Sequence, residues 1–344
     1  MTKPHRTGLP KPQRGFITAA DVARAAGVSR SAVSRTFTPG ASVSQEVRER
    51  VQDAARAMGY RVNRLASNLI SDESTLVGVV GSNLSSPFMS RQLDELSRAL
   101  QRSGRQCLLF NAADARDGVE PLIESILEFR VAAIVIMSGA PPSAIIDECL
   151  KNGVRVILVN RQPDEAAGDT VVSDDIHGVG LVADRLLRAG CRKLAVVGSG
   201  VPTPSQVRRR QLFASAMAKA GREVVTWSQG TSTYDSGLEA ARSLMPGSGI
   251  DGVFCTTDLI ALGFLDGARA CGLAVPEQVS VMGYDDIAQS AWLAYRLTTI
   301  RQSPVDLASA VVAALARSPD DGPSRAQSLL PVELVERDTV RSGA

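Results

Sequence analysis

The sequence predicts a small three-helix domain at the N-terminus, followed by a two-lobed α/β core with parallel sheets. Three observations predict this: short helical patterns fill the first part, apolar runs alternate with helical patterns after Thr75, and the charge changes sign between the parts. Residues 1–71 contain 12 Lys and Arg against 4 Asp and Glu, a balance of +8, and the rest holds 26 against 32, a balance of −6. A solvated basic surface is one interpretation, and a surface that meets a polyanion such as nucleic acid is the other.

The first 16 residues are expected to form a flexible arm, because they are basic and rich in proline. They lack the apolar stretch of a signal peptide, and the sequence has no run of 18 apolar residues that would span a membrane. We therefore expect a cytoplasmic protein with no membrane partner. Its 344 residues are enough for more than one domain.

Residues 17–60 contain start and stop signals for three helices. Thr18 predicts the cap of a helix that ends at Gly27, and Ser29 and Ser44 predict the caps of two more. The apolar positions expected to pack together are Val22, Val28, Val33, Phe37, Val47, Val51, Ala54 and Met58. Three helices around so small a core leave one polar, cationic helix face outward.

That outward face belongs to the second helix. Arg30, Ser31, Ser34 and Arg35 fall on one stripe of it, while Val33 points the other way. The major groove of DNA admits an α-helix, and arginine can pair with two acceptors of guanine. Short serine side chains suit phosphate contacts. The stripe therefore predicts a DNA-reading helix, with a solvated surface helix as the structural alternative.

Residues 61–74 are polar and are expected to form a hinge, in which ASNLI is too short to be a stable helix alone. The core follows over residues 75–340. Strand-like apolar runs occupy residues 75–81, 105–112, 131–139, 154–160, 193–200, 222–227, 252–257 and 279–286. Such continuous runs, joined by helices, predict parallel sheets covered on both faces and a ligand cleft between two lobes. The expected lobes comprise about 75–173 with 303–328, and about 174–300 with 329–340.

The cysteines predict neither a disulfide framework nor a metal site. They are Cys107, Cys149, Cys191, Cys255 and Cys271, widely spaced and without a CxxC pair. Buried reduced thiols are the expected state, and no cofactor or metal is implied.

An enzyme is the rival class of protein. The GSG at 198–200 follows a strand but lacks the GxGxxG spacing. His177 lies near Asp174 and Asp175, yet no GxSxG elbow accompanies a Ser–His–Asp arrangement. Catalysis would also leave the basic N-terminal domain unexplained, so we expect that the protein is not an enzyme.

The run TAADVARAAGVSRSAVSRTF, at 18–37, resembles the headpiece of the lac-repressor (LacI/GalR) family of bacterial transcription regulators. The resemblance continues through VSQEVRERVQDAARAMGYRVNRLASNLI, DGVFCTTDLIALG, VSVMGYDDI, LTTIRQ and LLPVELVERDT, so it covers about 18–339. It implies a helix-turn-helix headpiece and a periplasmic-binding-protein-like core. It also implies a homodimeric repressor that binds pseudo-palindromic double-stranded operator DNA under allosteric control by a small effector. A periplasmic sugar-binding protein shares the core layout, but it would need an export signal.

By this resemblance, Arg30, Ser31 and Arg35 read bases, and Ser29 and Ser34 contact phosphates. The remaining residues that it places at the DNA are Thr18, Asn63, Ala66 and Leu69. The hinge is expected to fold on DNA, where Leu69 wedges into the minor groove of the duplex and kinks it. Packing of Leu69 on the core is the alternative. Two departures from the family pattern occur here, Ala32 for a threonine and Val62 for a hinge proline.

The resemblance also implies a ligand cleft with a fixed set of residues. These are Phe88, Asn160, Ser173, Arg209, Thr257 and Asp285. Arg209 and Asp285 are expected to hold a hydroxyl-rich ligand such as a sugar, polyol or sugar acid, and a structural ion pair between them is the alternative. Because Arg209 lies in a run of arginines at 208–210, its register is open by one residue. Asn160 and Thr257 replace an aspartate and an asparagine of the family pattern. Asn160 thereby removes one negative charge, which makes an anionic ligand easier to accept, and a neutral sugar is the alternative.

Overall fold

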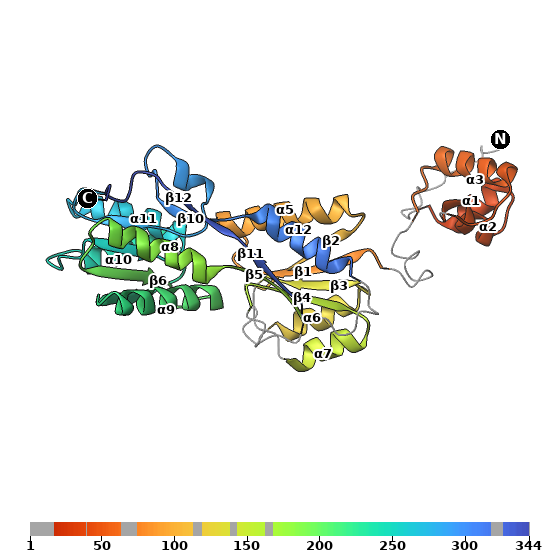
Figure 1. Cartoon of the computed structure of the whole chain (residues 1–344). Coiled ribbons are helices and arrows are strands. Elements are labelled where there is room, and N and C mark those ends of the chain that lie inside the picture. The colour runs from red at the N-terminus through yellow and green to blue at the C-terminus, as the bar shows by residue number, and fades with distance from the viewer. Residues whose placement is uncertain are drawn as a thin grey trace, which may run out of the picture. The chain divides into compact units, whose positions relative to one another are not determined.

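The computed structural model of the chain describes residues 17–38, 40–62, 74–112, 119–137, 143–161, 168–317 and 326–343. The chain divides into two compact units, residues 1–74 and residues 75–344 (Figure 1). Each unit has apolar core clusters of its own. Among the described residues, no helix is long and apolar enough to cross a membrane.

The N-terminal unit contains the three predicted helices. They are α1 (Ala19–Ala26), α2 (Arg30–Phe37) and α3 (Gln45–Met58). Thr18 and Asp21 cap α1 reciprocally, since the Thr18 hydroxyl accepts from the Asp21 amide at 3.3 Å and the Asp21 carboxylate accepts from the Thr18 amide at 3.0 Å. Gly27 ends α1 in the left-handed conformation, with φ of 66°. Val33 and Val51 are fully buried at the centre of the unit. The local caps therefore set the helix boundaries as the sequence predicts.

The first lobe of the second unit is built on a six-stranded parallel sheet with the order β11-β5-β4-β3-β1-β2. The strands are β1 (Leu76–Gly81), β2 (Gln106–Asn111), β3 (Ala133–Ile136), β4 (Arg155–Val159), β5 (Asp169–Ser173) and β11 (Gln327–Leu330). Helices α5 (Pro87–Arg102) and α12 (Pro304–Leu315) cover one face, and α6 (Glu120–Leu127) and α7 (Ser143–Lys151) cover the other (Figure 1). Val79 and Val80 point to opposite faces, and both are buried. This is why the strand is a continuous apolar run.

The second lobe has a four-stranded parallel sheet with the order β7-β6-β8-β9. Its strands are β6 (Leu194–Gly198), β7 (Val224–Ser228), β8 (Gly252–Cys255) and β9 (Ser280–Met282). Helices α10 (Tyr234–Leu244) and α11 (Asp258–Ala270) pack on one face, and α8 (Asp175–Arg188) and α9 (Pro204–Lys219) pack on the other. Helices α10 and α11 approach closely through Gly237 and Gly263, where an added Cβ would collide with the neighbouring backbone.

The chain passes between the lobes three times. It crosses from β5 to α8, from β10 (Thr299–Gln302) to α12, and from β11 to β12 (Val332–Val335), which pairs with β10 in an antiparallel ribbon. A short 3₁₀ helix, η2 (Ala288–Ala291), precedes β10. Strands β5, β10, β11 and β12 were not among the predicted strand runs. Strand β11 keeps residues as far as Leu330 in the first sheet, two residues beyond the predicted boundary of that lobe.

Candidate functional site

Helix α2 presents its predicted polar stripe to solvent. Arg30, Ser31, Ser34 and Arg35 are all exposed. Ser29 caps the helix, because its Oγ accepts from the Ala32 amide at 3.2 Å. Its hydroxyl also lies 2.8 Å from that of Ser31. The stripe thus combines two cationic side chains with hydroxyls at the positive end of a helix dipole, an arrangement suited to a polyanion.

No described carboxylate of the N-terminal unit pairs with the two arginines of this stripe. Within the described part of the N-terminal unit, the ion pairs join Arg24 to Asp21 and Arg56 to Asp53. Neither of these pairs involves α2, so Arg30 and Arg35 keep their guanidinium groups for other acceptors.

Thr18, another predicted DNA contact, is exposed, and its hydroxyl hydrogen-bonds to Asp21 at 2.7 Å. The other three predicted DNA contacts, Asn63, Ala66 and Leu69, lie outside the described residues, and their role stays a prediction.

A cleft of about 440 Å³ opens in the second unit, at the carboxyl ends of β4 and β5 and beside the first turns of α9. It is lined by Asn160, Val172, Ser173, Asp175, Pro204, Ser205, Val207, Arg208 and Gln211. The carboxyl ends of parallel strands are where ligands of open α/β sheets usually bind. The lining brings together two of the predicted ligand residues, Asn160 and Ser173, with α9 of the other lobe.

The position of Asn160 and Ser173 follows from the strand ends. Asn160 follows β4 in the left-handed region with φ of 58°, which asparagine tolerates better than most residues. Its backbone N–H donates to the Val171 carbonyl at 2.8 Å. The Ser173 hydroxyl donates to Oε1 of Gln302 at 2.7 Å. Ser173 therefore connects the cleft to the β10 strand of the second lobe.

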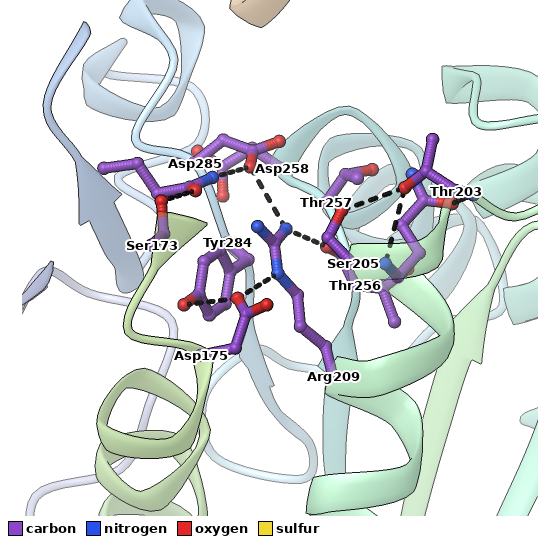
Figure 2. A network of polar contacts seen from close by, with 12 residues as sticks. Ser173, Asp175, Thr203, Ser205, Arg209, Thr256, Thr257, Asp258, Tyr284 and Asp285 are labelled. Carbon is purple, nitrogen blue, oxygen red and sulfur yellow. Dashed lines mark hydrogen bonds and ion pairs between the residues drawn. The ribbon is translucent and has the colours of Figure 1, made fainter. Parts of the chain in front are cut away.

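Arg209 lies behind the lining and is 3% exposed. Its Nε donates to Asp175 Oδ1 at 2.9 Å, and its Nη1 donates to the Thr256 carbonyl at 3.2 Å and to Asp285 Oδ1 at 3.4 Å. Figure 2 shows the two carboxylates reaching the guanidinium from different sides, with the Tyr284 ring beside it. The ion pair of Arg209 with Asp285, which was the structural alternative, is thus present. Neither residue is part of the lining that the described chain gives to the cleft.

Asp285 has an unusual pKa and an unusual backbone conformation. Burial raises its pKa well above the ordinary value, against the lowering effect of Arg209. Its Oδ1 also accepts from Gln302 Nε2 at 2.7 Å, and its backbone has φ of 128°, a rare conformation for a residue with a side chain. A polar chain therefore runs from Ser173 in the cleft through Gln302, Asp285 and Arg209 to Asp175, which lines the cleft again.

The other two predicted ligand residues lie away from the lining. Thr257 caps α11, with its Oγ1 accepting from the Ile260 amide at 3.5 Å and lying 3.3 Å from Ser232 Oγ. Phe88, at the start of α5, packs against the apolar core of the second lobe. The contribution of both residues to ligand binding stays a prediction.

Asp258, the first residue of α11, is a buried acceptor beneath this region. Its Oδ2 accepts from Ser290 Oγ at 2.7 Å and from the Ile287 amide at 2.9 Å, and its Oδ1 accepts from the Thr299 hydroxyl. Burial raises its pKa to about 6, although these hydrogen bonds act in the opposite direction. One carboxylate thus ties α11 to η2 and β10.

Asp174, considered above for a catalytic arrangement with His177, has a structural role. Asp174 caps α8 by accepting from the backbone amide of His177 at 2.9 Å, so this bond does not engage the imidazole. All five cysteines are free; Cys149, Cys191 and Cys255 are buried, and Cys107 is half-buried. The expectation of a buried thiol is wrong for Cys271, which is exposed just after the last turn of α11. Among the described residues, no group of three or more His, Cys, Asp or Glu side chains is placed to hold a metal.

Several residues of the site were not predicted. They are Asp175, Ser205, Arg208, Gln211, Tyr284 and Gln302. The run of arginines at 208–210 carried a signal for one of them, since its register was open. Tyr284 belongs to the VSVMGYDDI motif, but nothing in that motif indicates a stacked arginine.

Comparison with known proteins divides the chain in the same way. The family described as "Bacterial regulatory proteins, lacI family" matches residues 18–63, and the "Periplasmic binding protein-like domain" matches residues 183–340. The HTH-type transcriptional regulator AscG of Escherichia coli (strain K12) is 27% identical over 331 residues, which cover 94% of this chain and 98% of AscG. The sucrose operon repressor of Pediococcus pentosaceus is 28% identical over 320 residues, 92% of this chain and 97% of that protein. Both are regulators of transcription and not enzymes.

A solved structure shows the same fold over nearly the whole chain. The lac repressor dimer bound to operator and the anti-inducer ONPF matches with a TM-score of 0.86 and 24% sequence identity. The match covers 95% of this chain and 100% of that chain.

Proposed function

Because the chain belongs to the lacI family of bacterial regulatory proteins, we propose that it represses transcription by binding operator DNA under the control of a small ligand. It carries the DNA-binding headpiece of transcriptional regulators, joined to a periplasmic-binding-protein-like core. Such a regulator acts in the cytoplasm, where it meets chromosomal DNA.

The exposed stripe of α2 is the observation that carries the DNA-binding half of the proposal. Arg30 and Arg35 are exposed, and no ion pair joins them to the described carboxylates of their own unit. A guanidinium in the major groove can donate to both O6 and N7 of guanine, which distinguishes this base from the others. We propose that the exposed hydroxyls of Ser29 and Ser34 contact phosphates and so fix the helix in the groove.

We propose a homodimer on a pseudo-palindromic operator, since helix-turn-helix readers use two-fold symmetry to read two half-sites. The lac repressor, which has the same fold, is a dimer on its operator. Sedimentation of the free protein and of its operator complex measures this stoichiometry directly. A single copy of the chain on a full operator would contradict it.

The cleft supports the ligand-binding half of the proposal. Its volume of about 440 Å³ lies within the range of small-molecule sites. Amide and hydroxyl groups of Asn160, Ser173, Ser205 and Gln211 line it, and such groups both donate to and accept from hydroxyls. We therefore propose a hydroxyl-rich ligand such as a sugar or sugar acid. The name of the sucrose operon repressor connects one relative with sugar metabolism.

Ligand binding is proposed to change the angle between the lobes, because the cleft is lined by β4 and β5 of one lobe and α9 of the other. A ligand that reaches past Ser173 would meet Gln302 and the charged pair of Arg209 with Asp285, and Phe88 and Thr257 remain proposed contacts at that depth. By linkage, ligand and operator must alter each other's affinity by the same factor.

The experiment begins with selection of bound sequences from random DNA by the full-length protein. We expect an enriched pseudo-palindrome and, with that operator, a change of about 5- to 150-fold in affinity when the effective ligand is added. Sequencing of the selected DNA identifies the operator, and fluorescence anisotropy measures its affinity with and without the ligand. Failure to enrich any sequence would contradict the proposed operator binding. An operator affinity that does not change with a ligand that binds the protein would contradict the proposed regulation by ligand.

A further inference from the structure

Three consecutive arginines of α9 differ in what they contact. Arg209 is surrounded by Asp175 and Asp285, and Arg210 donates from Nη1 to Ser228 Oγ at 2.7 Å. Arg208 lines the cleft, and its buried Nε has no hydrogen-bond partner among the described residues. A buried donor of a cationic group without an acceptor lowers stability, so this arrangement needs a reason.

The described lining of the cleft contains one acidic side chain that could pair with Arg208. Asp175 is the acidic side chain of the described lining, and its Oδ1 already accepts from Arg209 Nε at 2.9 Å and from the Tyr284 hydroxyl at 3.1 Å. Asn160, which follows β4 in the other lobe, also lines the cleft but carries no charge. Among the described lining residues, the positive charge of Arg208 therefore has no committed counter-charge.

The start of α9 adds positive potential at the same place. Thr203 and Gln206 form a capping box there, and Pro204 and Ser205 of the first turn line the cleft. The first turn of a helix carries the positive end of the helix dipole, and this helix has 16 residues. The dipole and the Arg208 guanidinium therefore favour an anion at the same end of the cleft.

We infer that the ligand of the cleft carries an anionic group, a carboxylate or a phosphate, held by Arg208 beside the first turn of α9. Asn160, Ser173 and Gln211 then face the uncharged, hydroxyl-bearing part of the ligand. This inference rests on the proposed ligand control and narrows its chemical class. It assigns the anion to Arg208 because Arg209 already has two carboxylate partners.

The test uses the full-length protein and a panel of matched ligands at constant ionic strength. Each of D-glucose, D-galactose and D-mannose is paired with its uronic acid and its 6-phosphate, and inorganic phosphate is added as the minimal anion. Thermal shift ranks the panel, and calorimetric titration gives Kd for the strongest binder. The uronic acids and the 6-phosphates distinguish a carboxylate from a phosphate.

We expect an anionic member to bind most tightly, and its Kd to rise at least about tenfold in Arg208→Gln. Arg210→Gln is the matched control, because it removes a neighbouring guanidinium on the same helix that contacts Ser228. The control should keep Kd within about twofold. Thermal unfolding of Arg208→Met without ligand gives a second readout. Its midpoint should equal or exceed that of wild type, because an unpartnered donor is removed.

Three results would overturn the inference. In the first, a neutral sugar binds as tightly as its uronic acid and its 6-phosphate. In the second, an anion binds Arg208→Gln as tightly as it binds wild type. In the third, no member of the panel stabilises wild type more than it stabilises Arg208→Gln. A lower unfolding midpoint for Arg208→Met would also oppose it, by making Arg208 a structural residue. The proposed regulatory function fails separately, through operator selection and anisotropy.

Discussion

The guanidinium carbon of Arg209 lies 3.7 Å from the centre of the Tyr284 ring. Asp175 and Asp285 contact the same guanidinium at 2.9 Å and 3.4 Å (Figure 2). Burial opposes the charge of Arg209, but the carboxylates and the tyrosine outweigh this effect and hold its pKa above the ordinary value. The arginine is therefore part of the fold of the second lobe as well as a proposed ligand contact.

Replacement of Arg209 by methionine should lower the free energy of unfolding by about 3–5 kcal/mol, because Asp175 and Asp285 would stay buried without their cation. Arg209→Met should also lose the ligand response. Urea denaturation measures the stability. The control is Arg210→Met, which removes a bond to Ser228 and should cost about 0.5–1.5 kcal/mol. Equal losses in the two variants would show that the buried network contributes little.

Arg35→Ala should weaken binding to the selected operator by about 1–3 kcal/mol and leave binding to random DNA nearly unchanged. The reason is the exposed position of Arg35 on the outward face of α2. Competition gel shifts at one salt concentration measure the ratio of the two affinities. If the variant keeps the wild-type ratio, Arg35 does not read a base.

Leu69→Ala tests the role that the family resemblance gives to the hinge, a segment outside the described residues. We expect the variant to bend operator DNA less and to bind it more weakly, because an apolar wedge between base pairs stabilises the bent form. Circularly permuted DNA fragments report the bend in gel shifts. An unchanged bend angle in a folded variant would assign Leu69 to the protein interior instead.

Asp258 should make the second unit less stable as the pH rises. Its pKa is about 6 in the folded protein against an ordinary 3.8, so the folded state holds the proton more tightly than the unfolded state does. The stability that this group contributes is present below pH 4 and is lost as the pH rises through 6, by about 3 kcal/mol in total. Asp258→Asn should remove this part of the pH dependence.

Urea denaturation of wild type and of Asp258→Asn between pH 4.5 and 7 measures the difference, because other carboxylates, including Asp285, contribute to both proteins. Parallel pH profiles would mean that Asp258 is already ionised throughout this range. Its three hydrogen-bond donors would then outweigh its burial.

The helices of the N-terminal unit could be predicted from the sequence because their boundaries are set locally. Thr18, Ser29 and Ser44 each cap a helix, and Gly27 and Gly59 end two of them in the left-handed conformation. Apolar strands such as β1 and β6 could also be predicted, because burial on both faces makes each of them a continuous apolar run. Strands β10 and β12 contain polar residues and are strands because they pair with each other, 30 or more residues apart in the chain.

The ligand site could be predicted only in part. Its strand-end residues, Asn160 and Ser173, follow from the parallel sheet. The roles of Arg208 and Arg209 could not be separated, because successive residues of a helix differ by about 100° in direction. Asp175 on α8 determines which arginine turns inward, and that contact joins residues 34 positions apart.

The last stretch of the chain completes both lobes, since β11 borders the six-stranded sheet and β12 pairs with β10. During synthesis on the ribosome, the first lobe lacks a strand until β11 has emerged, and the second lobe lacks one until β12 has emerged. The N-terminal unit has all three of its described helices once Met58 is made, so it can fold long before. A late stop codon would therefore yield a protein that keeps the three helices of its N-terminal unit while both of its lobes stay incomplete.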